Sequence, residues 1–248
     1  MLSADRGDAE TLAHHRAIWA ARPELREVYQ EWFRQLLAAV AGLGPVVEVG
    51  SGPGFFKEFA PHLIATDVLP GPLVDVCCDA GQLPFGTATI GGLVMVDALH
   101  HLPRPLAFMD EAARVLRPGG RLAMLEPWIT PASFVLYRYF HQEGCRLGVD
   151  LEFPFDQTVK NALDGNPAIP FVLFKRFRDR LRTLRLVRAH TFVGLPYLFT
   201  FGFQRSRPLP GLWMGIAKAV EGFTGPVRKL AASRVLAVLE RSADGTVA

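Results

Sequence analysis

A glycine-rich turn near the start of the chain is the first feature that could hold a ligand. It spans residues 50–54, Gly-Ser-Gly-Pro-Gly, and follows a short apolar run at 45–49. Glycines tolerate positive φ and let a ligand approach the backbone, because they carry no Cβ. The third glycine comes one residue too early for the G-x-G-x-x-G spacing of a dinucleotide site, and Phe55 stands in its place. Glu48, beside the turn, suits a ligand amine better than a phosphate.

Two aspartates follow at the ends of predicted strands. Asp67 ends an apolar run at 63–66, about 19 residues after Glu48. A carboxylate at that position can accept hydrogen bonds from two ribose hydroxyls, although a surface turn would also explain it. Asp79 follows a third short strand, where it could accept from an adenine amino group or cap a turn.

Side chains able to move a proton stand after two later predicted strands. His100 and His101 are adjacent beyond a run at 93–96, and Glu126 follows a run at 122–125. His141 lies on the next predicted helix, with Glu143 near the same face. Ligands of open α/β sheets bind at the carboxyl ends of the strands. We therefore expect these groups to be candidate general bases, with only one of the adjacent histidines facing the ligand; a histidine that merely caps its loop is the alternative.

No metal site is expected from the spacing. Cys77, Cys78 and Cys145 form no C-x-x-C motif, and the histidine pair is adjacent rather than four residues apart. An odd number of cysteines does not suit a disulfide framework. We therefore expect a reducing, cytoplasmic compartment, with Cys77 or Cys78 as a small core residue.

Apolar periodicity indicates the elements that position these groups. Spacings of three and four predict a helix over 23–40, preceded by another around 8–20. A helix over 105–116 is expected to end in a turn at Arg-Pro-Gly-Gly, 117–120. Short apolar runs between these segments, and at 186–192 and 235–239, predict buried strands. Alternation of this kind predicts an α/β fold with a Rossmann-like, doubly wound and mainly parallel sheet.

Two intervals, 127–184 and 193–233, are too long to be bare loops. They are rich in aromatic residues and prolines. We expect helical insertions that wall an apolar pocket, closed from another side by the N-terminal helix bearing Tyr29 and Trp32.

The composition excludes several classes of chain. Of 248 residues, 50% are hydrophobic and 21% charged, which rules out a disordered or collagen-like protein. Residues 1–170 carry 13 Lys and Arg against 20 Asp and Glu, whereas residues 171–248 carry 14 against 4. The basic cluster at 174–188 is compatible with a helix on an anionic membrane, but we favour an ordinary helix packed on the sheet.

Five motifs together resemble the class I S-adenosylmethionine-dependent methyltransferases in order and spacing. They are residues 48–54, Asp67, 79–85, 97–102 and 115–120. The Glu-Pro-Trp at 126–128 resembles, more specifically, the small-molecule, methyltransferase-11-like bacterial members.

The resemblance covers roughly residues 44–126, and the last two strands resemble the family's terminal antiparallel hairpin. It implies a seven-stranded, mostly parallel sheet and one domain over 1–248. In that domain 1–43 would be a helical lid, 44–126 the cofactor-binding core, and the two insertions the acceptor pocket. It also implies that Glu48 and the glycine turn hold the methionine moiety, Asp67 the ribose and Asp79 the adenine, with Asp97 beside the sulfonium. The cofactor-binding residues so implied are Glu48, Gly50, Ser51, Gly52, Gly54, Asp67, Val68, Asp79, Ala80 and Asp97.

The leading interpretation is methyl transfer from S-adenosylmethionine to a small, rather apolar acceptor by in-line displacement. A base from among His100, His101, Glu126 and His141 would be needed only for a protonated acceptor. A catalytically silent cofactor-binding module and a methyltransferase acting on a lipid-like acceptor at a membrane remain alternatives. The glycine spacing disfavours a nicotinamide oxidoreductase. Nucleic acid is not an expected partner, since the chain lacks an Asn/Asp-Pro-Pro-Tyr/Phe motif.

Overall fold

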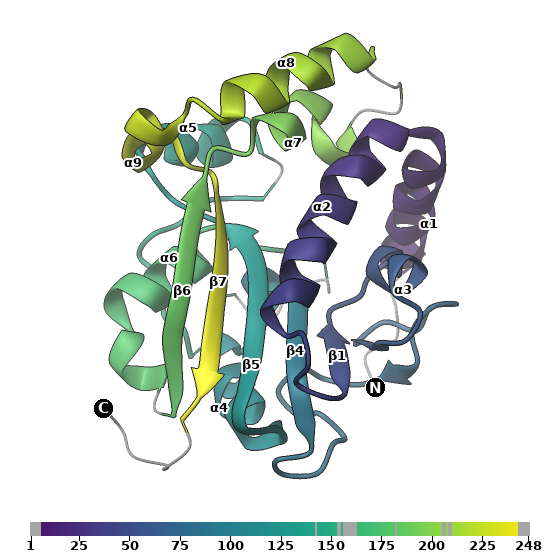
Figure 1. Cartoon of the computed structure of the whole chain (residues 1–248), viewed down its shortest axis with the longest axis vertical. Helices are drawn as coiled ribbons and strands as arrows, with labels where there is room; N and C mark the ends of the chain where they lie inside the picture. Colours follow the sequence, from purple (N-terminus) through teal and green to yellow (C-terminus); the bar gives the residue numbers. More distant parts are fainter. Residues whose placement is uncertain are drawn as a thin grey trace.

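The computed structural model describes residues 6–141, 143–152, 155, 163–181, 183–204, 207 and 210–242. Within these residues seven strands form one sheet in the order β3-β2-β1-β4-β5-β7-β6 (Figure 1). The first five strands pair in parallel, and β7 is antiparallel to both β5 and β6. The predicted mixed sheet with a C-terminal antiparallel hairpin is therefore confirmed. The strands are β1 (Val46–Val49), β2 (Ile64–Asp67), β3 (Val76–Cys77), β4 (Ile90–Val96), β5 (Leu116–Pro127), β6 (Leu184–Phe192) and β7 (Arg234–Arg241).

Helices cover both faces and one end of the sheet. Two N-terminal helices precede β1, and later helices lie between the strands and in the two long insertions. The α-helices are α1 (Arg6–Ala21), α2 (Pro23–Ala39), α3 (Phe55–Phe59), α4 (Pro105–Val115), α5 (Pro131–Tyr139), α6 (Ile169–Arg176), α7 (Leu195–Thr200), α8 (Gly211–Glu221) and α9 (Arg228–Ala231). Short 3-10 turns add η1 (Leu99–His101), η2 (Arg178–Leu181), η3 (Gly202–Gln204) and η4 (Gly225–Val227).

The central strands are apolar on both faces, as buried parallel strands must be. On β5, Leu122 and Met124 pack into the core that contains α4 and α6, whereas Ala123 and Leu125 pack into the core that contains α2 and α3. This alternation follows from the two-residue period of a strand. Figure 1 shows α2 lying across one face of the sheet. The fold is therefore a three-layer α/β/α arrangement.

Helices α2 and α4 start at proline, which suits the first turn because its missing N–H needs no partner there. Pro23 begins α2 and Pro105 begins α4. Thr130 caps α5: its side chain accepts from the Ser133 N–H, and Ser133 in turn bonds the Thr130 N–H. The cap fixes where the first insertion leaves β5.

The expected turn at 117–120 is wrong. Helix α4 ends at Val115 and β5 begins at Leu116, so this stretch is the irregular first part of the strand. Gly119 has φ +75°, and the β4–β5 register shifts between Ile90 and Gly92. The glycines allow a bulge here, where a loop was predicted.

The basic segment 174–188 is also not one helix. Helix α6 ends at Arg176, η2 follows, and Arg185 and Arg188 lie on β6. Pairing of β6 with β7 outweighs the helical spacing of the charges, because spacing alone says nothing of a distant partner strand. Arg182, one of the predicted basic face, lies outside the described residues.

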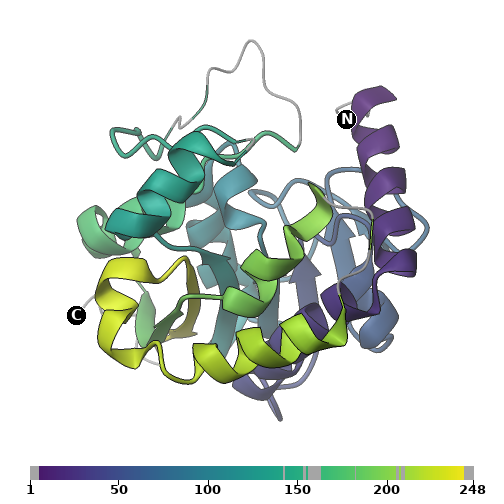
Figure 2. The ribbon, with the colours of Figure 1, turned by 90° about the horizontal axis from the view of Figure 1, so that it is seen from above.

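Apart from α6, which packs against β5 on one face of the sheet, the helices of the insertions gather at one end of the sheet. Figure 1 shows α5, α7, α8 and α9 at the end where β6 finishes and β7 starts. Since β6 runs parallel to β5, this is the end at which the parallel strands terminate. Seen from above, these helices and α1 surround the strand ends (Figure 2). Among the described residues no helix combines the length and apolarity needed to cross a membrane.

Candidate active site

A cavity of about 660 Å³ lies at the carboxyl ends of β1, β2 and β4. Its floor consists of the glycine turn and the loops that follow these strands. Leu12 and His15 of α1 and residues of the two insertions form its walls. Twelve of the side chains or backbone positions predicted from the sequence line it: Glu48, Gly50, Ser51, Gly52, Asp67, Val68, Asp79, Ala80, Asp97, His100, His101 and His141.

The glycine turn is held rigidly between β2 and β4. The Gly50 and Ser51 N–H groups both donate to the Thr66 carbonyl, at 2.9 and 3.0 Å. Gly50 has φ +74°, and a Cβ on it would stand 2.6 Å from the Cβ of Ala98. Only glycine combines this positive φ with the absence of a Cβ, so the backbone of residue 50 stays open to the cavity.

Gly54, in contrast, does not line the cavity. It begins α3 with φ +82°, and a Cβ there would lie 2.4 Å from the Cβ of Leu73. A glycine is needed at position 54 because the chain packs closely against Leu73. Gly54 therefore has a structural role in place of the predicted ligand contact.

Glu48 places a carboxylate in the floor beside the turn. The residue is buried, and among the described residues its Oε2 has no hydrogen-bond partner. Burial, with the nearby charge of Asp67, raises its pKa to about 8. A buried acceptor with no donor is costly unless a ligand supplies one. This atom therefore fits a cationic or N–H-bearing group of a ligand.

Asp67 and Asp79 extend the floor along the strand ends. Asp67 accepts from the Gly52 N–H at 2.7 Å and the Leu69 N–H at 2.8 Å. Burial raises the pKa of Asp67, although these backbone donors oppose the shift. Asp79 accepts from Gly81 N at 2.7 Å and pairs with Arg104 at 3.3 Å in an exposed position. Each carboxylate keeps lone pairs for a ligand hydroxyl or amine.

Asp97 and Arg234 form an ion pair at the cavity wall. Asp97 follows β4 with φ +50°, a left-handed conformation that aspartate tolerates better than most residues. Arg234 begins β7, is buried, and stacks over the Tyr197 ring at 4.4 Å. Arg234 carries only a weak signal in the sequence, as a single basic residue directly before the apolar run 235–239.

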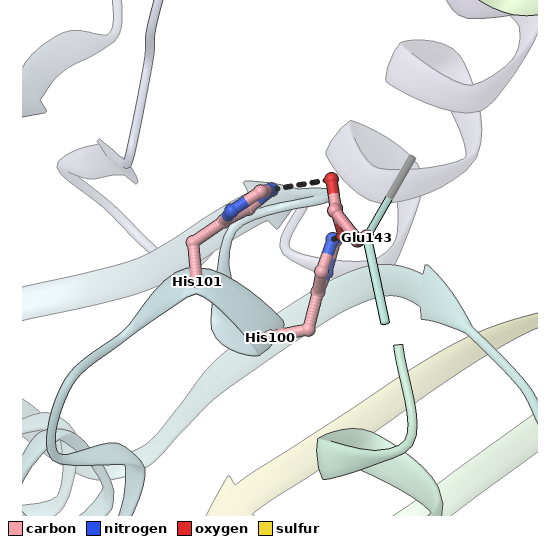
Figure 3. Close-up of side chains that lie close together, drawn as sticks. All are labelled: His100, His101 and Glu143. Carbon is pink, nitrogen blue, oxygen red and sulfur yellow. Dashed lines mark ion pairs between the residues drawn. The ribbon is translucent and has the colours of Figure 1, made fainter. Parts of the chain in front are cut away.

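His100, His101 and Glu143 form a compact cluster (Figure 3). His100 Nε2 lies 3.3 Å from Glu143 Oε2, and His101 Nε2 lies 3.8 Å from Glu143 Oε1. The prediction that only one histidine faces the cavity is wrong. The 3-10 turn η1 places the two rings 4.1 Å apart, and both line the cavity.

The charges in this cluster are already paired. Burial disfavours the charged form of His100, but Glu143 and Glu126 outweigh it and raise its pKa to about 10. Burial opposes ionisation of Glu143 too, yet His100 lowers its pKa to about 2. At neutral pH His100 is therefore an imidazolium between carboxylates, which does not suit a general base.

Glu126 does not line the cavity, and the predicted catalytic contact is corrected. Its side chain is fully buried. One oxygen accepts from the Ala98 and Leu99 N–H groups at 2.9 and 2.7 Å, and the other lies 2.7 Å from His100 Nδ1. Glu126 is thus a positioning residue that fixes η1 and the His100 ring.

His141 reaches the cavity from beyond the end of α5. The helix stops at Tyr139, so the predicted helical face shared with Glu143 is wrong. The His141 ring meets Tyr137 edge-on at 5.4 Å, and its Nδ1 accepts from the Glu143 N–H at 3.3 Å. Burial lowers its pKa, so the ring is neutral and its Nε2–H is a donor.

The aromatic residues of the insertions divide between wall, core and surface. Tyr137, Phe155, Tyr197 and Phe203 line the cavity, as does Tyr29 of α2. Trp32 instead lines a second, smaller cavity. Phe174 is core, whereas Tyr139, Phe140, Phe199 and Phe201 are exposed. Phe153 lies outside the described residues.

The two adjacent cysteines differ in burial, and one of them packs against the core as expected. Cys77 is exposed and not a core residue, because β3 is a two-residue edge strand. Cys78 is partly buried against the core and lines the cavity.

Part of the chain is similar in sequence to known methyltransferases. The family model of the methyltransferase domain matches residues 47–124. A 27-O-demethylrifamycin SV methyltransferase of Amycolatopsis mediterranei (strain S699) is 41% identical over 54 residues, 22% of this chain. The match spans 20% of that relative's length.

Two solved structures share the fold. An S-adenosylmethionine-dependent methyltransferase from Archaeoglobus fulgidus matches with a TM-score of 0.52 at 14% identity, over 87% of this chain and 94% of its own. Geranyl diphosphate C-methyltransferase from Streptomyces coelicolor A3(2) matches with a TM-score of 0.51 at 15% identity, over 85% and 78%. Residues 47–124 are thus similar to the methyltransferase domain, and the chain shares the fold of these two solved structures.

Proposed function

We propose that the protein transfers the methyl group of S-adenosylmethionine to a small, rather apolar acceptor. The observation that supports this most is that two groups of residues line one cavity. Glu48, the glycine turn and Asp67 form the first group, and Tyr137, His141 and Tyr197 form the second, which marks the end proposed for the acceptor. A cofactor and an acceptor can therefore meet inside one shared volume.

The floor residues fit the polar groups of this cofactor. The unpaired Oε2 of Glu48 suits its amino group, and Asp67 suits its ribose hydroxyls. Asp79 and Ala80 stand further along the floor, where the adenine would lie. When bound, the cofactor supplies an electrophilic methyl group on a sulfonium.

The chain's own contribution is alignment and exclusion of water. The aromatic wall lets an apolar acceptor replace solvent, and the Nε2–H of His141 can orient an acceptor oxygen. His100 and Glu126 hold η1 in place and contribute no free base.

Calorimetry with S-adenosylmethionine and its demethylated product tests the cofactor assignment, with NAD as the competing ligand. Transfer of labelled methyl to a panel of small apolar alcohols, phenols and carboxylates then separates an enzyme from a silent binding module. Preferential binding of NAD would overturn the proposal. Tight cofactor binding without transfer to any member of a broad panel would favour the silent module.

A second candidate, a lipid-like acceptor taken from a membrane surface, is favoured by one observation. Among the described residues, all exposed large hydrophobic side chains except Val187 belong to α5, α7 to α9 and the segments next to them. On α8, η4 and α9 they recur every three or four residues, with Arg228 and Lys229 beside them. The stripe is Leu212, Ile216, Val220, Phe223, Val227 and Leu230, and Trp213 adjoins it.

Helix α8 packs on α7, whose Tyr197 lines the cavity, so the stripe lies on the outer side of the acceptor end. An interfacial helix needs such an apolar face with adjacent cations. Co-sedimentation with vesicles containing phosphatidylserine tests it at low and high salt. Phe223→Ser and Ile216→Ser should weaken binding, whereas Val187→Ser on β6 should not. If the wild-type protein stays in solution at low salt, the second candidate fails.

A further inference from the structure

The cluster of His100, His101 and Glu143 has the composition and geometry of a metal-binding cradle. One ligand atom from each residue lies within 4.8 Å of the others. His100 Nε2 lies 3.3 Å from Glu143 Oε2, and His101 Nε2 lies 3.8 Å from Glu143 Oε1. Four ligands at zinc-bonding distances around a tetrahedral ion stand about 3.4 Å apart. The ligand atoms of the three side chains are therefore spaced much as they would be around one metal ion.

The outer contacts of His100 match those of a metal ligand. A histidine that binds a metal through one ring nitrogen usually donates from the other to a carboxylate. His100 does so: Nδ1 lies 2.7 Å from Glu126 Oε2, which leaves Nε2 facing Glu143. Glu126 is itself fixed by the Ala98 and Leu99 N–H groups. This outer carboxylate orients the ring and sets its tautomer.

The chain also closes tightly around the cluster. The Asn166 N–H donates to the His100 carbonyl at 3.0 Å and brings the next segment alongside. At Gly165 a Cβ would stand 2.5 Å from Glu143 Oε2 and 2.9 Å from His101 Cε1. Gly165 therefore leaves the space that the carboxylate and the ring occupy, and a side chain there would displace them.

We propose that His100, His101 and Glu143 bind one divalent transition-metal ion, of which zinc(II) fits best. Two imidazoles and a carboxylate are the donor set of zinc and similar ions, whereas magnesium and calcium prefer oxygen ligands alone. The metal takes the place of the proton on His100 Nε2, so one proton leaves as the ion binds. Glu126 remains outside the coordination shell.

Three protein ligands leave a fourth position open, as in catalytic zinc sites. All three residues line the cavity, so that position faces the space proposed for the acceptor. An acceptor that presents a hydroxyl or carboxylate oxygen would complete the shell. This last step rests on the proposed methyl transfer, whereas metal binding itself does not.

In the sequence, the adjacency of the two histidines does not favour a metal site, because ligand pairs on a helix stand four residues apart. The 3-10 turn η1 removes that objection by placing consecutive rings side by side. The third ligand comes from beyond α5, more than forty residues later in the chain.

Titration of chelator-treated protein with zinc(II) or cobalt(II) tests the proposal, read by calorimetry and by the cobalt absorption spectrum. We expect one ion per chain. Glu143→Gln and His101→Ala should each weaken binding at least about tenfold, and Glu126→Gln about 10–100-fold because the ring loses its orienting charge. His62→Ala and His190→Ala, both exposed and outside the cavity, serve as matched controls.

Binding of S-adenosylmethionine to Glu143→Gln should equal that of the wild-type protein, which shows that the variant is folded. Metal affinity that is unchanged in Glu143→Gln, or wild-type protein that takes up no ion while binding the cofactor, overturns the metal site. Metal binding without cofactor binding instead overturns the proposed function and leaves the metal site standing.

Discussion

The guanidinium of Arg234 pairs with the carboxylate of Asp97, although the two residues stand 137 positions apart in the chain. Arg234 opens the antiparallel strand β7, and Asp97 follows the parallel strand β4. The Arg234 side chain also stacks over Tyr197 and, at 5.2 Å, over Trp32. One buried cation thus joins the hairpin, the second insertion and helix α2 at the wall of the cavity.

Removing this cation should destabilise the fold strongly. Arg234→Met leaves Asp97 without its partner in a mostly buried position, and we expect a loss of about 3–5 kcal/mol in the free energy of unfolding. The double variant with Asp97→Asn should lose less than the two single variants summed, because each single change already breaks the pair. Denaturant unfolding measures all three. Strict additivity would show that the two side chains do not interact.

Gly50 and Gly42 provide a matched test of the glycine turn. Their φ values are nearly equal, +74° and +73°, but a Cβ meets Ala98 only at Gly50. Gly42→Ala should therefore cost about 1–2 kcal/mol from backbone strain alone. Gly50→Ala should cost more and should also weaken S-adenosylmethionine binding. Equal losses of stability in the two variants, with cofactor affinity intact in both, would contradict the close approach of residue 50 to Ala98 and to the cofactor.

Asp67→Asn should weaken cofactor binding at least about tenfold. Hydrogen bonds to a charged group contribute about 1.5–3 kcal/mol each, and the amide carries no charge. Asp75→Asn is the control, since Asp75 also accepts a backbone N–H, from Ala65 at 2.8 Å, but does not line the cavity. Calorimetry of both variants decides the ribose assignment, which fails if their affinities are alike.

Cofactor affinity should rise with pH because of Glu48. The folded, ligand-free chain keeps a proton on this carboxyl up to a pKa of about 8, against an ordinary value of 4.5. The ammonium of the cofactor prefers the carboxylate, so binding must release that proton. Between pH 6 and 8 affinity should increase by up to about tenfold per pH unit.

The same shift affects stability with the opposite slope. The folded state holds the Glu48 proton more tightly than the unfolded state, so this residue's contribution to stability falls as pH rises from about 4.5 to 8. Calorimetry in buffers of different ionisation enthalpy counts the released proton, and Glu48→Gln should abolish both effects. A wild-type affinity independent of pH would rule out an ammonium at this carboxylate.

Local patterns predicted the sheet because strand and helix periods are themselves local. The runs at 45–49, 63–66 and 93–96 are short, and each ends within one residue of the end of a parallel strand. The helix predicted at 174–188 failed for a complementary reason. Its charges have helical spacing, but its later half pairs with β7, and that pairing depends on residues some fifty positions away.

The cavity floor could be anticipated residue by residue, whereas the walls could be anticipated as aromatic insertions but not in the detail of their contacts. Glu48, Gly50 and Asp67 follow one another at spacings set by strand, turn and helix. Glu143 and Arg234 reach the cavity only through the paths of the insertions and the hairpin, which no local period encodes. Glu126 was placed at the correct strand end, yet burial and three hydrogen-bond partners decide its role.

The floor and the aromatic wall of the cavity are encoded by different stretches of chain. Glu48 and Asp67 of the floor fall within residues 47–124, the part that matches the methyltransferase domain, whereas the aromatic wall residues Tyr29, Tyr137 and Tyr197 lie outside it. Under the proposed function, substitutions of the aromatic wall would change which molecule is accepted without altering how the methyl donor is held. For an engineer, or for natural divergence, acceptor choice would then be a separately adjustable trait.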